Sequence, residues 1–314
     1  MLVPASPCRR FIIAPVHIEH LRIPVGAGHL HAERVGRGGL PIVLLHGFGT
    51  SAFLWRNVAP VLANEGFTVL SLDLLGHGES DRSDDAAYGL EAQAEYVDRA
   101  LTALRVPGAA IVGQDIGCIV ALMLAARRPR QIRKLVLVSP PDLASLPPAS
   151  VRAVQRSSAR AAITANELFG AFPLVRSLLS AGVADPGHMN ERLIARYAAP
   201  FVGSDGVAHL LMLARAMEVE NVDQIDLAAV TSDTLLVSGD ADAWSEPGSV
   251  PRLARRLSAA ATRIENAPNV GHLVAEDAPA LLARLLLDWF SAPPVSQIGS
   301  SETENPSVSF GQRP

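Results

Sequence analysis

The sequence predicts an α/β fold in which a mostly parallel sheet is covered by helices on both faces. Short apolar runs alternate with helical patterns in the first 140 residues and again after residue 230, as a parallel sheet with crossover helices requires. Between residues 142 and 221 this alternation stops and only helical patterns occur, so we expect a helical insertion that covers one edge of the sheet.

The first half of the chain supplies most of the expected sheet. Residues 17–25 and 29–35 flank the turn Gly26-Ala27-Gly28 and predict a β-hairpin. Short apolar runs predict four further strands, at 41–45, 67–72, 109–112 and 134–138. Helical spacing of apolar residues predicts three helices, at 53–63, 90–104 and 117–127.

The second half resumes the same alternation after the insertion. Strands are expected at 234–237 and 262–265, and helices at 250–257 and 273–290. The tail is rich in Ser, Pro, Gln and Glu, which is typical of disorder. We therefore expect a core domain in two parts, 16–141 and 222–290. A helical lid, 142–221, lies between them, and a disordered tail, 291–314, follows.

Composition excludes several classes of protein. The 314 residues are 49% hydrophobic and carry a net charge of −4 without a basic stripe, so no nucleic-acid partner is expected. Apolar segments are too short for a membrane span, and the N-terminus does not resemble a signal peptide. Two cysteines, Cys8 and Cys118, cannot form a disulfide scaffold, which favours a reducing compartment such as the cytoplasm.

A tight turn between an expected strand and an expected helix is the first chemical signal. Asp115 lies at its centre, with Gly113 two residues before it and Gly117 two residues after it. Glycines at these positions let the backbone bend sharply, so that the central side chain is exposed to a reactant. Taken alone, the pattern also fits an Asp that caps a helix.

Four other motifs lie where the expected strands end. They are His46-Gly47-Phe48-Gly49, the segment from Asp73 to Ser80, Gly239-Asp240-Ala241-Asp242 and Gly271-His272. Together with the turn at Asp115 they resemble the α/β-hydrolase superfamily, whose reactive groups occur in the chain order nucleophile, acid, base. The resemblance covers residues 16–290 and implies a lid inserted after the sixth strand.

The resemblance also implies roles for individual residues. Asp115 takes the position of the nucleophile and His272 that of the base. Asp242 fits the family's spacing from glycine to the acid; Asp240 beside it is read as a solvated loop carboxylate, and Asp142 after the sixth strand is a weaker alternative. The backbone N–H groups of Phe48 and Ile116 lie where the family forms its oxyanion hole.

An Asp nucleophile indicates a particular class of reaction. A carboxylate is already ionised at neutral pH and can displace a leaving group from saturated carbon, giving an alkyl ester. The base then activates water to hydrolyse that ester. This scheme is what a resemblance to epoxide hydrolases and haloalkane dehalogenases implies, and it needs no cofactor.

The leaving group decides between these two families. Haloalkane dehalogenases hold the halide with an Asn and a Trp, where this chain has Phe48 and Ile116, so we expect hydrolysis of an epoxide to a vicinal diol. A dehalogenase with an atypical halide site is the alternative, and a non-hydrolytic cyclase or binder is a third. The acid that opens the ring is expected in the lid, where the candidates are Tyr197, His188 and His209.

The expected partner is a small apolar substrate held between lid and sheet. Aromatic residues are the candidates for lining this pocket: Phe48, Trp244, Phe169, Phe172 and Phe201. No histidine pair has a sequence spacing typical of a metal site, so no metal is predicted. The resemblance implies a monomer or a homodimer.

Overall fold

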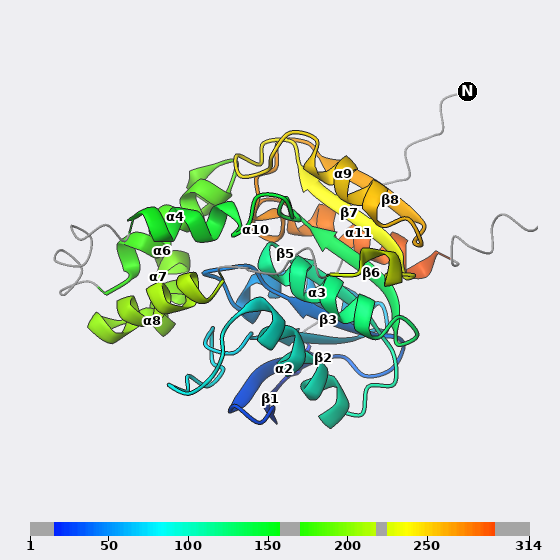
Figure 1. Ribbon diagram of the computed structural model, residues 1–314, viewed down its shortest axis with the longest axis horizontal. Coiled ribbons are helices and arrows are strands. Elements are labelled where there is room, and N and C mark those ends of the chain that lie inside the picture. Colours follow the sequence, from blue (N-terminus) through cyan, green and yellow to red (C-terminus); the bar gives the residue numbers. More distant parts are fainter. Residues whose placement is uncertain (1–15, 158–169, 218–224, 293–314) are drawn as a thin grey trace, which may run out of the picture.

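An eight-stranded sheet in the order β1-β2-β4-β3-β5-β6-β7-β8 runs through the molecule (Figure 1). The computed structural model describes residues 16–157, 170–217 and 225–292. The strands are β1 (Ile18–Pro24), β2 (His29–Val35), β3 (Pro41–Leu45), β4 (Thr68–Leu72), β5 (Ala109–Gln114), β6 (Ile132–Val138), β7 (Asp233–Gly239) and β8 (Thr262–Ala267). β2 pairs antiparallel with β1 and β4, and the pairs from β4 to β8 are parallel.

Helices lie on both faces of the sheet and at one end of it. They are α1 (Ala59–Asn64), α2 (Leu90–Ala103), α3 (Ile116–Arg127), α4 (Ala149–Ser157), α6 (Phe172–Gly182), α7 (Glu191–Ala198), α8 (Gly203–Ala216), α9 (Ser249–Arg256), α10 (Val274–Asp277) and α11 (Pro279–Ser291). Single 3₁₀ turns are η1 (Ala52–Trp55), η2 (Pro186–His188), η3 (Ala199–Phe201) and η5 (Leu227–Ala229).

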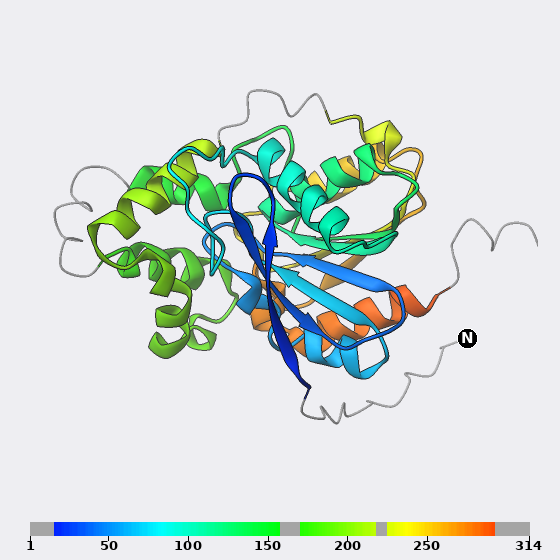
Figure 2. The ribbon, with the colours of Figure 1, turned by 90° about the horizontal axis from the view of Figure 1, so that it is seen from below.

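Two apolar cores lie on opposite faces of the sheet. On one face α2, α3 and α9 pack on the strands, and on the other α1 and α11 pack together (Figure 2). The central strand β5 is buried along its whole length. Burial on both faces explains why the strands read in sequence as short, continuous apolar runs rather than as alternating ones.

The helices α4, α6, α7 and α8 follow β6 and lie together at one end of the sheet (Figures 1 and 2). This confirms the predicted fold class, a mostly parallel sheet with a helical insertion after the sixth strand. We call these four helices the lid. The described residues end at 292, so almost all of the tail predicted from residue 291 lies outside them. The last described helix, α11, ends at Ser291.

Two predicted helices are each broken in the structure. The helix expected at 53–63 consists of η1 and α1, and Pro60 lies in the first turn of α1. The helix expected at 273–290 consists of α10 and α11, and Pro279 begins α11. Proline has no N–H to continue a preceding helix but fits the first turn of a new one, which explains both breaks.

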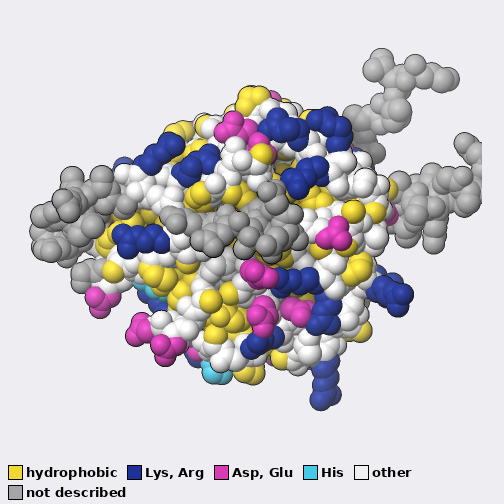
Figure 3. Space-filling view, viewed as in Figure 1, with side chains coloured by type: hydrophobic (Ala, Val, Ile, Leu, Met, Phe, Trp, Pro, Cys, Tyr) yellow, Lys and Arg dark blue, Asp and Glu magenta, His cyan; other side chains and the backbone are white. Residues whose placement is uncertain are grey.

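Acidic and basic side chains are interspersed over the described part of the face drawn in Figure 3. This pattern agrees with the small net charge of the chain. Among the described residues, no helix is long and apolar enough to cross a membrane.

Candidate active site

Asp115 lies at a sharp turn between β5 and α3. Its backbone has φ 52° and ψ −119°, a conformation that is costly for any residue with a side chain. A Cβ at Gly113 would lie 2.3 Å from the carbonyl oxygen of Gly117, and one at Gly117 would lie 2.6 Å from that of Leu45. The two glycines are therefore required for the close backbone approach that aims Asp115 at the site.

His272 follows β8, and its backbone position is fixed by the sheet beside it. Its carbonyl oxygen accepts hydrogen bonds from the Ser139 hydroxyl at 2.8 Å and from the Gln114 side-chain amide at 3.1 Å. The ring is buried and stands 4.8 Å, centroid to centroid, from the indole of Trp244.

Asp242 holds the imidazole of His272 from the far side. Its Oδ2 accepts from Nδ1 of His272 at 2.9 Å, and its Oδ1 accepts from the backbone N–H of Trp244 at 2.9 Å. Because a carboxylate can only accept, Nδ1 of His272 carries a hydrogen and Nε2 is directed toward Asp115. Nε2 lies 3.7 Å from Oδ1 of Asp115.

The two oxygens of Asp115 have different surroundings. Oδ2 accepts from the backbone N–H of Phe48 at 3.0 Å and from the hydroxyl of Ser150 at 2.7 Å. Oδ1 is buried and, among the described residues, has no hydrogen-bond donor. One oxygen is thus held in place and the other is available to attack.

The charges of this buried cluster shift its pKa values in opposite directions. Burial by itself raises the pKa of Asp115, but His272, Ser150 and the Phe48 N–H together hold it below its ordinary value. Burial likewise lowers the pKa of His272, but the charges of Asp242 and Asp115 and the bond to Asp242 outweigh it and raise the pKa to about 10. At neutral pH His272 is therefore protonated, and its ring lies between Asp242 and Asp115.

The cavity beside Asp115 is narrow. It has a volume of about 10 Å³, room for about one water molecule. His272, Asp242 and Trp244 line it together with the start of the lid, and its rim carries the polar groups Asp142, Arg152 and Glu246. Trp244, which was expected to line the substrate pocket, thus borders the cavity beside Asp115.

The other aromatic candidates lie elsewhere. Phe172 and Phe201 line a separate cavity of about 460 Å³ between α6, α7 and η3, and Asp115 does not border it. Phe48 contributes its backbone N–H to Asp115, and its ring stands edge-on to His77. Phe169 lies outside the described residues.

The three candidate acids of the lid have other partners. The Tyr197 hydroxyl is buried and donates to Glu276, which forms an ion pair with Arg56 at 2.6 Å. His188 bonds Asp277 at 2.9 Å, and Nε2 of His209 contacts the carbonyl oxygen of Gly76 at 2.8 Å. None of these bonds reaches Asp115 or His272.

The alternative acids also bond away from His272. Asp142 forms an ion pair with Arg252 at 2.5 Å, and Asp240 accepts from the backbone N–H of Asn269 at 2.6 Å. Asp242, rather than Asp142 or Asp240, is therefore the carboxylate that bonds the imidazole of His272. The second predicted oxyanion donor, the N–H of Ile116, makes no hydrogen bond to Oδ2 in the described part of the chain.

Ser150 is the residue of this site that sequence reasoning missed. It lies in the first turn of α4, is 1% exposed and contacts Asp115 from 35 residues away in the chain. A serine near a helix start is common, and its only signal would have been the position of that helix over the sheet.

A buried carboxylate, Asp73, supports the loop that carries the Phe48 N–H. Oδ1 of Asp73 accepts from the N–H of Ala52 at 2.6 Å, and Oδ2 accepts from Nδ1 of His31 at 2.8 Å and from the N–H of Glu79 at 2.9 Å. These bonds join three segments at the carboxyl end of β4.

The family model for the alpha/beta hydrolase fold matches residues 41–279, which include Asp115, Asp242 and His272. The chain belongs to the α/β-hydrolase fold family.

Relatives within the family include both of the enzyme classes considered above. The chain is 36% identical to a haloalkane dehalogenase of Agrobacterium fabrum over 118 residues, which are 38% of each protein. It is 32% identical to bifunctional epoxide hydrolase 2 of Rattus norvegicus over 146 residues, 46% of this chain and 26% of that protein. These alignments therefore cover less than half of each relative.

A solved structure aligns over nearly the whole fold. Haloalkane dehalogenase DbeA from Bradyrhizobium elkani USDA94 has a TM-score of 0.71 and 26% identity, over 88% of this chain and 98% of that one. The chain is thus similar in sequence to dehalogenases and epoxide hydrolases, and similar in fold to a haloalkane dehalogenase.

Proposed function

We propose that this α/β-hydrolase opens an epoxide through an ester on Asp115 and hydrolyses that ester to a vicinal diol. The observation that carries the proposal is the asymmetry of the Asp115 carboxylate: Oδ2 is held by two donors, whereas Oδ1 is buried, without a donor among the described residues, and 3.7 Å from His272. A carboxylate oxygen arranged in this way is suited to attack saturated carbon.

In the first step Oδ1 attacks one ring carbon and the bond from that carbon to the ring oxygen breaks. The ring oxygen needs a proton as it leaves, and protonated Nε2 of His272 faces Oδ1 and so can supply it. The step consumes one carboxylate charge and one imidazolium charge, and it gives a neutral hydroxyalkyl ester beside a neutral imidazole.

The second step uses the same imidazole as a base. With Asp115 esterified, one of the two charges that raise the pKa of His272 is gone, so the ring can accept a proton from water. That water attacks Cγ, and the negative charge develops on Oδ2, where the Phe48 N–H and the Ser150 hydroxyl donate. The bond from Cγ to Oδ1 breaks, the alkoxide so released takes the proton of the hydroxyl newly bound to Cγ, and the diol leaves. Asp115 is then ionised again and His272 protonated, so the cycle closes.

Assigning the acid to His272 removes the need for a tyrosine in the lid. Tyr197 was one of three candidate donors, and its hydroxyl donates instead to Glu276. A halide, by contrast, leaves as an anion and takes no proton, so an imidazolium beside the nucleophile serves an epoxide better than a haloalkane.

A carbon–halogen substrate is the second candidate, and the relation to haloalkane dehalogenase DbeA favours it. Phe48 and Ile116 offer no side-chain N–H to a halide, so such an enzyme would need another donor. The indole of Trp244, which lines the cavity beside Asp115, is the group to test.

Turnover of an epoxide and haloalkane panel in ¹⁸O-labelled water tests both candidates. An ester on Asp115 places ¹⁸O in the Asp115 carboxylate during the first turnover, which mass spectrometry of the peptide detects, and the product identifies the leaving group. Diol formation with label in Asp115 supports the proposal, and halide release with the same label supports the second candidate. Label in the product alone, or turnover that persists in Asp115→Ala, would contradict both.

A further inference from the structure

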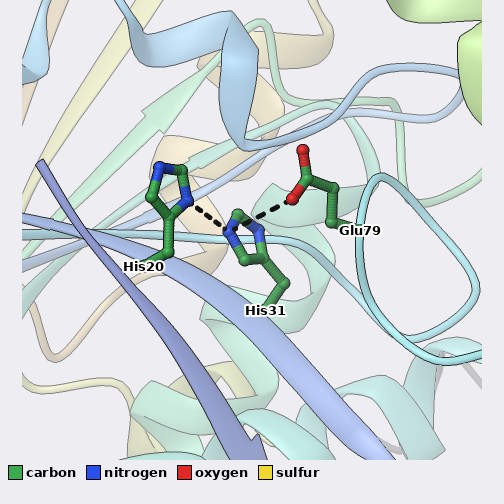
Figure 4. Close-up of side chains that lie close together, drawn as sticks. All are labelled: His20, His31 and Glu79. Carbon is green, nitrogen blue, oxygen red and sulfur yellow. Dashed lines mark hydrogen bonds and ion pairs between the residues drawn. The ribbon is translucent and has the colours of Figure 1, made fainter.

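Three potential metal ligands meet where the loop after β4 lies against one face of the β1–β2 hairpin. Nδ1 of His20 on β1 lies 3.0 Å from Nε2 of His31 on β2, and that nitrogen lies 3.8 Å from Oε2 of Glu79 in the loop after β4 (Figure 4). All three ligand atoms lie within 4.8 Å of one another. The cluster lies outside the Asp115 site and plays no part in the proposed reaction.

The strand register explains how residues so far apart in sequence come together. His20 pairs with Glu33 and His31 pairs with Arg22, so the two histidines are diagonal neighbours on one face of the hairpin. The loop after β4 then folds back over β2, because Asp73 N–H donates to the His31 carbonyl and His31 N–H donates to the Ser80 hydroxyl. Spacing in the sequence shows none of this, which is why no metal was predicted.

His31 is already oriented as metal-bound histidines are. Its Nδ1 donates to the buried carboxylate of Asp73 at 2.8 Å, so in the neutral ring the lone pair is on Nε2 and faces His20 and Glu79. A carboxylate behind a histidine is the usual outer support of a zinc ligand, because it fixes the ring and makes the outer nitrogen more basic.

The charge around the cluster also favours a cation. The Asp73 carboxyl group accepts hydrogen bonds from His31 Nδ1 and from the backbone N–H groups of Ala52 and Glu79. Glu79 adds a second carboxylate, whose Oε1 forms an ion pair with Arg196 at 3.2 Å, and Glu33 lies directly opposite His20 in the strand register.

We propose that His20 Nδ1, His31 Nε2 and Glu79 Oε2 bind a divalent transition-metal ion, with zinc the best match and water as a fourth ligand. Tetrahedral zinc with bonds of about 2.0–2.1 Å separates its ligand atoms by roughly 3.3 Å. The observed separations of 3.0 and 3.8 Å lie on either side of that value. His20 is exposed and can rotate away from its hydrogen bond with His31 to admit the ion.

Such an ion would clamp the edge hairpin to the loop after β4. Its binding is therefore expected to stabilise the folded protein by mass action. It leaves the hydrolytic site intact, because neither Asp115 nor His272 is a ligand.

The test is zinc binding to the full-length, tag-free protein after its metal has been stripped with a chelator. Isothermal titration with Zn²⁺ should give one site, and Zn²⁺ should raise Tm. His20→Ala and Glu79→Gln should each lose at least about tenfold in affinity, by analogy with outer-shell losses of about 10–100-fold. His17→Ala, which removes a histidine just before β1, is the matched control and should bind as the wild type does. Cys8→Ser run in parallel detects any contribution from that thiol.

Each outcome decides the proposal. One site that weakens in His20→Ala and Glu79→Gln but persists in His17→Ala and Cys8→Ser supports it. No binding by the wild type overturns it. It is also overturned if both ligand variants bind as the wild type does, or if His17→Ala or Cys8→Ser loses as much affinity as they do.

Discussion

The hydroxyl of Ser150 donates to Oδ2 of Asp115 at 2.7 Å, so the first helix of the lid contacts the proposed nucleophile directly. Both side chains are buried, and the contact is the lid's one hydrogen bond to Asp115 among the described residues. In the proposed reaction negative charge develops on this oxygen when water attacks the ester, which would give the lid a part in the chemistry.

Ser150→Ala is therefore expected to slow ester hydrolysis. Loss of one oxyanion donor lowers kcat by about 10²–10³-fold in other hydrolases, and we expect a loss toward the lower end because the Phe48 N–H remains. The ester on Asp115 should accumulate, which intact-mass spectrometry after rapid quenching measures. Ser145→Ala, at a serine that lines the same cavity but does not bond Asp115, is the control. An unchanged kcat in Ser150→Ala would remove the hydroxyl from the mechanism.

Two aspartates near the site provide a matched pair of substitutions. Asp242→Asn should lower turnover by up to about 10⁴-fold, because an amide does not hold the imidazole in the required tautomer. Asp142→Asn removes the charge from an ion pair with Arg252, whereas its Oδ1 can still accept from the Ala144 N–H, so turnover should be unchanged. Steady-state kinetics on both variants, with circular dichroism to verify folding, checks this. A larger loss in Asp142→Asn would assign the acid to the end of β6 instead.

The pH dependence of ester formation tests the role of His272. Its raised pKa, about 10, means that the ring is protonated at neutral pH in the free enzyme, and this acid is lost only as the pH rises through that value. Single-turnover ester formation from an epoxide should thus be constant over roughly pH 6 to 8 and fall near pH 10. Ester formation from a haloalkane needs no proton, so its rate should not fall near pH 10.

His272→Gln extends the same comparison. The variant should be alkylated slowly by epoxides, because the acid is missing, and any ester formed should persist, because the base is missing too. Intact-mass measurements over time follow both effects. Epoxide alkylation at the wild-type rate would show that another group protonates the ring oxygen.

Tyr197→Phe separates a structural role from a chemical one. The hydroxyl donates to the buried Glu276 of the Arg56 ion pair, and loss of a hydrogen bond to a charged group costs about 1.5–3 kcal/mol of unfolding free energy. We expect a lower Tm with little change in kcat. Arg56→Ala should cost more, about 3–5 kcal/mol, because it leaves the buried Glu276 without its ion-pair partner. A large fall in kcat with unchanged stability in Tyr197→Phe would restore the tyrosine as the acid.

Sequence patterns predict the elements and site residues whose conformation depends on nearby residues in the chain. The glycines around Asp115 are visible in sequence because the turn cannot form without them, and His272 and Asp242 follow strands whose apolar runs are equally visible. The structure places these three side chains together as the family order implies.

Contacts that depend on how distant elements pack could not be predicted in this way. Ser150 reaches Asp115 only because α4 crosses the end of the sheet, and Tyr197 turns to Glu276 because that carboxylate is buried beside it. Phe172 and Phe201 were assigned to the substrate pocket from their apolar character alone, which does not say which cavity a side chain faces. The breaks at Pro60 and Pro279 were also missed, although the prolines that cause them are visible in the sequence.

The bonds of Asp73 have a consequence for how this protein can change through mutation. One carboxylate holds His31 of the proposed metal cluster, and it also holds Ala52, in the loop that presents the Phe48 N–H to Asp115. Substitutions on the hairpin and in that loop therefore share a partner, and residues that share a partner show interaction energies of about 0.5–3 kcal/mol. Variants at His31 and near Phe48 should display epistasis, so each of the two regions restricts which mutations the other can accept.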